Sequence, residues 1–132
     1  MGLIYLDTCL LIYTIENDTR RAPAVVAAMA GQEAAQFAVS PLVKMECLVK
    51  PMKQADLSLQ KRYETGLSRF VQLPLPERVF LHAAQLRARF NLKTPDALHL
   101  ACAQHHGCAA LWTNDDRLAQ SSHGLAVNVL KH

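Results

Sequence analysis

Short apolar runs alternate along this chain with segments of helical periodicity, and this alternation limits the fold more than any other feature. Residues 3–6 form a continuous apolar run that is typical of a strand buried on both faces of a parallel sheet. Apolar residues then recur at helical spacing over residues 10–15. Strands that alternate with helices form right-handed βαβ units, so the pattern predicts an α/β protein with a parallel sheet covered by helices on both faces.

The same criteria predict the remaining elements. Further strands are expected at residues 37–39, 70–73, 109–112 and 125–129, the last of them at an edge of the sheet. Further helices are expected at residues 41–50, 54–69, 76–90 and 95–106. Ser40 and Thr94 are predicted N-caps, because each is followed by a proline that suits the first helical position. The helix that follows Ser40 is predicted to end at Pro51, and the helix that follows Thr94 is predicted to end at Gly107.

The composition indicates one globular domain over residues 1–132. Apolar residues make up 51% of the chain and charged residues 19%, a mixture that excludes disorder and low complexity. Because the apolar runs are too short to span a membrane and no secretion signal is recognisable, we expect a cytoplasmic protein without membrane contact. The four cysteines lack disulfide or metal spacing, so buried free thiols are expected. The net charge of +3 permits contact with a polyanion without establishing it.

Acidic residues lie where a parallel sheet binds its ligands. Asp7 follows the first predicted strand and Asp115 and Asp116 follow the fourth, while Glu46 and Asp96 lie in predicted helices. Ligands of such sheets bind beyond the carboxyl ends of the strands. Crowded carboxylates repel one another and therefore imply a cation, and an all-oxygen site favours magnesium or manganese.

Each acidic residue also has a purely structural interpretation. Asp7 is explained equally well as a helix N-cap, and Glu46 is explained more readily as a solvated or ion-paired helix residue. Asp96 complements the helix dipole, and Asp115 and Asp116 suit a polar turn. Only their joint placement indicates a site.

Other chemistries fit the sequence less well. A zinc site is disfavoured because consecutive helix positions cannot all face one ion. Its ligands would be Cys102, His105, His106 and Cys108. Ser40 and Thr8 lack a recognisable histidine base, and the chain has no GxSxG motif or phosphate-binding glycine loop. A haloacid-dehalogenase-type phosphatase would need a second aspartate at Cys9. His99, three residues after Asp96, is expected to pack or to support a neighbour, not to act as a general base.

Four segments together resemble the PIN-domain ribonucleases, specifically the VapC-type toxins of prokaryotic toxin–antitoxin pairs. These segments are LIYLDTCLLIY, VSPLVKMECLV, LKTPDALHLACA and LWTNDD. The resemblance extends from about residue 3 to about residue 130, and the order and spacing of all four acidic motifs match. TPDALHLACA followed by TND is the most specific part. One departure is Cys9, where the family frequently has a small polar residue.

The resemblance implies a three-layer α/β/α fold with a central five-stranded parallel sheet. It also implies a magnesium-dependent endoribonuclease, with Mn²⁺ as an alternative ion, that forms a homodimer and is inhibited by a cognate antitoxin. The products would carry 5′-phosphate and 3′-hydroxyl ends.

The resemblance further assigns the site residues. The catalytic residues would be Asp7, Glu46, Asp96 and Asp115. The metal would be held by some of Asp7, Asp96 and Asp115, while Glu46 would bind it through water or orient the attacking water. The auxiliary residues would be Thr8, Thr113, which positions the last carboxylate, and Asp116. The candidates for guiding the RNA backbone are Arg20, Arg21, Lys50, Lys93 and Arg117.

The sequence leaves two alternative functions open. One is a non-catalytic module that binds RNA or a partner protein, although a binder of polyanions gains nothing from concentrated negative charge. The other is a metal-dependent DNA nuclease on the same scaffold, because nothing in the sequence recognises a 2′-hydroxyl. For the antitoxin we expect an apolar surface along the first helix and the segment after it. Its residues would be Leu10, Leu11, Tyr13, Ile15, Val25, Val26 and Met29.

Overall fold

A computed structural model describes residues 2–130 and contains a sheet of five parallel strands. The strands are β1 (Leu3–Leu6), β2 (Gln36–Val39), β3 (Val71–Gln72), β4 (Ala110–Thr113) and β5 (Ala126–Asn128). Their order in the sheet is β3-β2-β1-β4-β5, so β1 lies at the centre and β5 at an edge. The predicted parallel sheet and its edge strand are confirmed.

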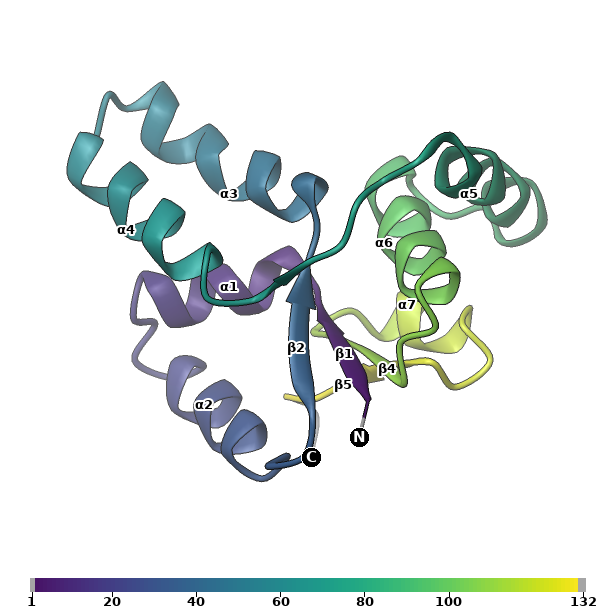
Figure 1. Ribbon diagram of the computed structural model, residues 1–132, viewed down its shortest axis with the longest axis horizontal. Helices are drawn as coiled ribbons and strands as arrows, with labels where there is room; N and C mark the ends of the chain where they lie inside the picture. Colours follow the sequence, from purple (N-terminus) through teal and green to yellow (C-terminus); the bar gives the residue numbers. More distant parts are fainter. Residues whose placement is uncertain (1, 131–132) are drawn as a thin grey trace.

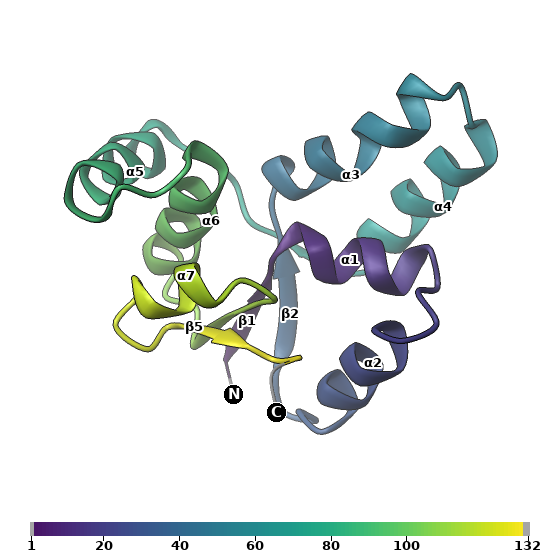
Figure 2. The same cartoon turned by 180° about the vertical axis from the view of Figure 1, so that it is seen from behind.

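Helices cover both faces of this sheet. They are α1 (Thr8–Ile15), α2 (Ala22–Ala30), α3 (Pro41–Lys53), α4 (Leu57–Leu67), α5 (Glu77–Phe90), α6 (Thr94–His105) and α7 (Asp116–Gln120). Figure 1 shows α1 and α2 on one side of the strands and α5 and α6 on the other. The helices α3 and α4 pack together as a hairpin that projects from the sheet, which the view from behind in Figure 2 also shows. The three-layer α/β/α fold is therefore confirmed.

The strand residues and the helix α6 form the centre of the core. Tyr5 and Leu111, in the neighbouring strands β1 and β4, are 0% exposed. In α6, residues 97–103 are all buried, which fits a helix that is apolar around most of its surface. All four cysteines are free as predicted, and Cys47, Cys102 and Cys108 are buried, whereas Cys9 is only half-buried.

The register of the central strands determines where the site forms. Leu6 pairs with Trp112, and the Asp7 amide donates to the Trp112 carbonyl at 2.9 Å. The residues that follow β1 and β4 therefore leave the sheet at the same level.

Three predicted helix boundaries are wrong. The helix α4 begins at Leu57, not at residue 54. The N-cap of α6 is Lys93, so Thr94 is already the first helical residue and Pro95 the second. The helix α3 continues through Pro51 to Lys53, because a proline so near the end of a helix disrupts only its last turn. In addition, α2 and α7 are helices that the sequence analysis did not predict. Within residues 2–130, no helix is long and apolar enough to span a membrane.

Candidate active site

Asp7 occupies the junction between β1 and α1, where it is the N-cap of the helix. Its Oδ1 atom accepts a hydrogen bond from the Thr8 amide at 2.8 Å, and its Oδ2 atom accepts one from Thr113 Oγ1 at 2.7 Å. The side chain remains 13% exposed. Because each carboxylate oxygen has two lone pairs, these bonds fix the carboxylate and leave it able to bind a ligand.

Asp115 lies beside Asp7 because Thr113 is bonded to both residues. The fully buried Thr113 hydroxyl accepts from the Asp115 amide at 3.0 Å while it donates to Asp7. Asp115 is the N-cap of α7, where its Oδ1 atom accepts from the Arg117 amide at 2.9 Å. Thr113 therefore holds the ends of β1 and β4 in a fixed relation.

Glu46 reaches the carboxyl ends of the strands from the second turn of α3. Its Oε1 atom accepts from Thr8 Oγ1 at 2.6 Å and lies 2.7 Å from His99 Nε2. Burial raises the pKa of Glu46, but the hydrogen bonds from His99 and Thr8 outweigh burial and lower it. Glu46 is thus an ionised carboxylate at neutral pH.

Asp96 projects from the first turn of α6. Burial raises its pKa, and the negative charges of Asp115 and Asp7 raise it further, against the opposing effect of His99 and Lys93. The repulsion places Asp96 close to both other aspartates. The structure therefore brings all four predicted acidic residues to one end of the sheet.

The donor chemistry at this edge fits a hard divalent cation. Within residues 2–130, no three histidine, cysteine, aspartate or glutamate side chains are close enough to hold a metal ion by themselves. Mg²⁺ does not need such a cage, because it is usually bound by one or two carboxylates, several waters and substrate phosphates. The all-oxygen donors and the raised pKa of Asp96 match that kind of site.

A chain of buried polar side chains lies beneath the carboxylates. The Tyr5 hydroxyl is 2.7 Å from Ser40 Oγ and 2.6 Å from His99 Nδ1. Tyr5 and Ser40 are 0% exposed and His99 is 1% exposed. Burial, as the largest effect, raises the pKa of the Tyr5 phenol.

Sequence reasoning missed Tyr5 and the function of Ser40. Two spacings could have indicated this chain: Tyr5 precedes Asp7 by two residues, and therefore points to the same face of the strand, and His99 follows Asp96 by three, one turn along the helix. Thr8 also has a histidine neighbour that the sequence did not indicate, since His99 Nε2 lies 3.5 Å from Thr8 Oγ1.

The PIN domain family model matches residues 4–123 of this chain. The chain belongs to the PIN domain family. PIN domains are generally nucleases, so hydrolysis of phosphodiester bonds is the activity typical of this fold.

Solved structures of PIN domains agree with this assignment. A toxin–antitoxin complex from Klebsiella pneumoniae has 25% identity and a TM-score of 0.79, with 96% of this chain and 97% of that chain covered. VapBC2 from Rickettsia felis, bound to a DNA fragment from its promoter, has 16% identity and a TM-score of 0.81, with coverages of 96% and 98%. DNA-bound VapBC from Salmonella typhimurium has 21% identity and a TM-score of 0.78, with coverages of 97% and 98%. No curated protein matches the sequence. The resemblance to VapC-type toxins is confirmed.

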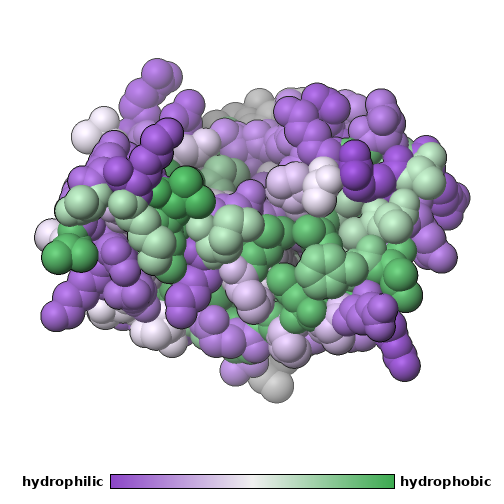
Figure 3. Space-filling model, turned by 90° about the horizontal axis from the view of Figure 1, so that it is seen from above, coloured by the Kyte–Doolittle hydropathy of each residue, from purple (hydrophilic) through white to green (hydrophobic). Residues whose placement is uncertain are grey.

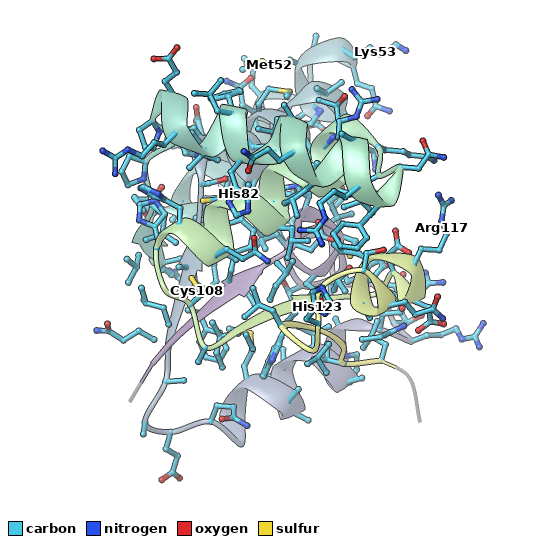
Figure 4. The ribbon with its side chains drawn as sticks, turned by 90° about the vertical axis from the view of Figure 1, so that its right-hand side faces the viewer. Met52, Lys53, His82, Cys108, Arg117 and His123 are labelled. Carbon is cyan, nitrogen blue, oxygen red and sulfur yellow. The ribbon has the colours of Figure 1, made fainter. Side chains whose placement is uncertain are left out.

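The remaining candidate residues of this PIN domain lie in different surroundings. Asp116 accepts a hydrogen bond from Asn128 at 3.0 Å, which connects it to β5. Lys50 pairs with Glu16 Oε1 at 2.5 Å, and Glu16 caps the end of α1 opposite to Asp7. The Arg117 side chain points outward from α7 (Figure 4).

The three remaining candidate cations lie near Asp96 or near Asn114. Lys93 is the N-cap residue of α6 and affects the pKa of Asp96. Arg20 and Arg21 line a cavity of about 370 Å³ together with Asn114, which directly precedes Asp115. Arg21 is held there by Asp18, at 3.5 Å, and by the Tyr13 ring, 4.9 Å from its guanidinium carbon.

The expected apolar surface of the PIN domain needs a correction. Leu10, Leu11 and Val25 are each 1% exposed and belong to the core, because α1 and α2 pack against each other and α1 also packs on β4. Val26 is 56% exposed. A larger hollow of about 650 Å³ lies between α1 and α4, and we call it the α1–α4 cavity. Its lining includes Leu11, Ile15 and Phe70, with Lys61, Arg62 and Arg69 among its polar residues.

Proposed function

We propose that this PIN domain is a magnesium-dependent endoribonuclease, the toxin of a toxin–antitoxin pair, that a cognate antitoxin neutralises. One observation carries the proposal: the carboxylates of Asp7, Glu46, Asp96 and Asp115 meet at the ligand-binding end of a PIN-fold sheet. Concentrated negative charge repels RNA unless a cation is present, so the cluster favours a metal-dependent nuclease over a module that only binds polyanions.

The carboxylates would divide the chemistry between them. Some of Asp7, Asp96 and Asp115, which interact electrostatically, would hold Mg²⁺ together with water and a substrate phosphate. When bound, the ion would lower the pKa of a coordinated water and offset charge on the phosphate. Thr113 fixes the orientation of Asp7, and Thr8 fixes that of Glu46.

Glu46 would orient the attacking water. Its lowered pKa keeps it ionised at neutral pH, so it can accept a hydrogen bond from that water. The water oxygen then forms a bond to phosphorus while the bond from phosphorus to the 3′-oxygen breaks. The attacking water gives up one proton and the departing oxygen takes one up, which leaves a 3′-hydroxyl on one product and a 5′-phosphate on the other.

Positive side chains around the carboxylates would guide the RNA backbone. Arg20 and Arg21, beside Asn114, and Lys93, beside Asp96, are the best placed. Arg117 follows in the turn after Asp115. Lys50 is a weaker candidate because Glu16 engages it.

An antitoxin segment would occupy the α1–α4 cavity. The Klebsiella pneumoniae relative is part of a toxin–antitoxin complex, which suggests the same kind of partner here. The apolar residues of the cavity suit an amphipathic helix, and Lys61, Arg62 and Arg69 suit acidic side chains on it.

A second copy of the chain would cover α3. Met45, Val49 and Met52 are 55%, 54% and 55% exposed and follow one another at helical spacing. Figure 3, which views the molecule from above and therefore from the side of α3 and α5, shows apolar surface among polar residues. Such a stripe is typical of a contact between protein chains.

A cleavage assay tests the proposed function. The purified protein is incubated with total RNA and, separately, with single-stranded DNA, in the presence of Mg²⁺ and of a chelator. We expect RNA fragments with 5′-phosphate ends only when Mg²⁺ is present. Cleavage of DNA alone would establish the DNA nuclease instead, and binding of RNA without cleavage would establish the non-catalytic module.

The neighbouring residues Asp115 and Asp116 provide a matched pair of variants. Asp115→Asn should abolish cleavage, because it removes a charge from the cluster. Asp116→Asn should retain most of the activity, because Asn128 holds this side chain toward β5. The opposite result would mean that Asp116, and not Asp115, belongs to the acidic cluster.

A further inference from the structure

Three buried side chains beneath the acidic residues form a continuous hydrogen-bonded chain that ends at Glu46. The contacts are Ser40 Oγ to Tyr5 OH at 2.7 Å, Tyr5 OH to His99 Nδ1 at 2.6 Å, and His99 Nε2 to Glu46 Oε1 at 2.7 Å. Ser40, Tyr5 and His99 are at most 1% exposed, whereas the Glu46 side chain is 27% exposed. We call this set the Ser40–His99 chain.

The packing of the core does not require these polar groups. Ser40 occupies the N-cap position of α3, yet its side chain makes no capping bond and is directed to Tyr5 instead. Burying hydroxyl and imidazole groups costs free energy, which well-packed apolar side chains would avoid. The cost is offset here because every buried side-chain nitrogen and oxygen atom in residues 2–130 has a partner.

The carboxylate of Glu46 determines which group donates in each hydrogen bond of the Ser40–His99 chain. An ionised Glu46 can only accept, so the proton must lie on His99 Nε2. In a neutral imidazole, Nδ1 then carries the lone pair and accepts from the Tyr5 hydroxyl. The Tyr5 oxygen in turn accepts from Ser40. Every bond thus points toward the carboxylate.

The two donors to Glu46 converge on the same oxygen. His99 Nε2 and Thr8 Oγ1 lie 2.7 and 2.6 Å from Oε1. Together they hold this oxygen, and with it the carboxylate, in one orientation. Since the Glu46 side chain is 27% exposed, its second oxygen, Oε2, is the one that would bind a water molecule.

We propose that His99 is a positioning residue, held in one tautomer by Tyr5 and Ser40, that orients Glu46 for its part in phosphodiester hydrolysis. The proposal rests on the proposed nuclease function. It assigns Tyr5 and Ser40 to the same task, although neither reaches the substrate side of the carboxylates.

Two amide substitutions of His99 distinguish orientation of Glu46 from a role in packing alone. In His99→Gln the amide nitrogen lies near the position of Nε2 and can still donate to Glu46. In His99→Asn the amide lies near the position of Nδ1, and the donor to Glu46 is lost. With a short fluorophore-labelled single-stranded RNA and Mg²⁺, we expect His99→Asn to lower kcat on the order of 10- to 100-fold with little change in KM. His99→Gln should recover most of this loss, and equal kcat values in the two variants would overturn the proposal.

A pair of tyrosines supplies a control that keeps the core shape. Tyr5→Phe removes the hydroxyl that orients His99 and should lower kcat several-fold. Tyr63→Phe also removes a buried hydroxyl bonded to a carboxylate, but that carboxylate is Glu16, at the far end of α1. Tyr63→Phe should lower the melting temperature and leave kcat unchanged. Unchanged kcat in Tyr5→Phe would overturn the assignment of Tyr5.

A spectroscopic measurement tests the hydrogen bonds of the Ser40–His99 chain without substrate or metal. Nitrogen-15 NMR of the imidazole in chelator-treated protein distinguishes a protonated from an unprotonated Nε2. A proton on Nε2 of His99 and none on Nδ1 is the expected result, and an unprotonated Nε2 or a protonated Nδ1 would overturn the proposal. Wild-type protein that cleaves neither RNA nor DNA would refute the proposed function, while the NMR result would still decide how His99 is bonded.

Discussion

Asp7 combines a structural and a chemical task in one side chain. As the N-cap of α1 it accepts from the Thr8 amide, and it also accepts from Thr113. The two interpretations of this residue, cap and site carboxylate, are therefore compatible. A substitution can separate them only if it preserves the cap.

Asp7→Asn is such a substitution. Asparagine is as good an N-cap as aspartate, so the melting temperature should stay within about 4 °C of wild type. The loss of one negative charge from the proposed metal site should lower Mg²⁺-dependent cleavage by at least ~100-fold. Near wild-type cleavage would exclude Asp7 from the site, and a marked fall in melting temperature would mean that the cap is its main function.

Asp96→Asn should stabilise the metal-free protein at neutral pH. Burial and the charges of Asp115 and Asp7 raise the pKa of folded Asp96 above its unfolded value, so the ionised group costs stability above the folded pKa. That cost vanishes as the pH falls below the unfolded pKa of about 3.9. Urea unfolding in the presence of a chelator measures this difference. The free energy of unfolding of Asp96→Asn should exceed that of wild type at pH 7 and equal it near pH 3. Mg²⁺ should stabilise wild type more than the variant, and a destabilised variant at pH 7 would contradict the repulsion.

The acidic residues of the site could be predicted from the sequence, whereas the polar groups that hold them could not. Asp7 and Asp115 directly follow apolar runs, and parallel strands bring their carboxyl ends together. Tyr5 is itself part of an apolar run, so its hydroxyl has no distinguishing pattern. Its partners Ser40 and His99 lie 35 and 94 residues away, and only the fold brings them into contact.

At the level of secondary structure, the errors in prediction have local causes. The helix α2 begins at Ala22, and its N-cap residue Arg21 makes no side-chain capping bond. The helix α7 has only five residues, too few for a periodic pattern. In α6 the residues Thr94, Pro95 and Asp96 suit the start of a helix equally well if the boundary shifts by one position. Long amphipathic helices such as α5 were predicted because their periodicity extends over several turns.

The start of α4 depends on a single cap. Asp56 Oδ1 accepts from the Leu59 amide at 3.0 Å. Asp56→Ala should lower the free energy of unfolding by about 1 kcal/mol, and Asp56→Asn, which keeps a capping oxygen, should lower it by much less. Urea denaturation at fixed protein concentration measures both, and equal losses would show that charge matters here and not the cap. Cleavage should be unchanged in either variant, since Asp56 lies in the hairpin of α3 and α4 and not among the site carboxylates.

At the scale of the whole molecule, the exposed stripe on α3 makes the proposed homodimer testable. Val49→Asp places a charge in the middle of the stripe, where burial in an interface would be costly. Light scattering at micromolar concentration should report a dimer for wild type and a monomer for this variant. Val26→Asp, at an equally exposed residue of α2, should remain dimeric. A wild-type monomer would remove the dimer from the proposal.

The proposed antitoxin would contact two different surfaces, the acidic cluster and the α1–α4 cavity. We therefore expect some changes to weaken inhibition without weakening binding. An arginine or lysine of the antitoxin that reached Asp7 and Asp115 would supply the positive charge that Mg²⁺ otherwise provides, whereas the α1–α4 cavity holds apolar side chains. Replacing that basic residue with alanine should weaken inhibition roughly 10-fold, and higher salt should do the same because it screens the pair. Binding through the cavity should largely persist after the alanine replacement and should be lost in Ile15→Asp, which leaves cleavage by the free protein intact. Inhibition that survives the loss of every basic residue would mean that the antitoxin acts by covering the site and not by neutralising its charge.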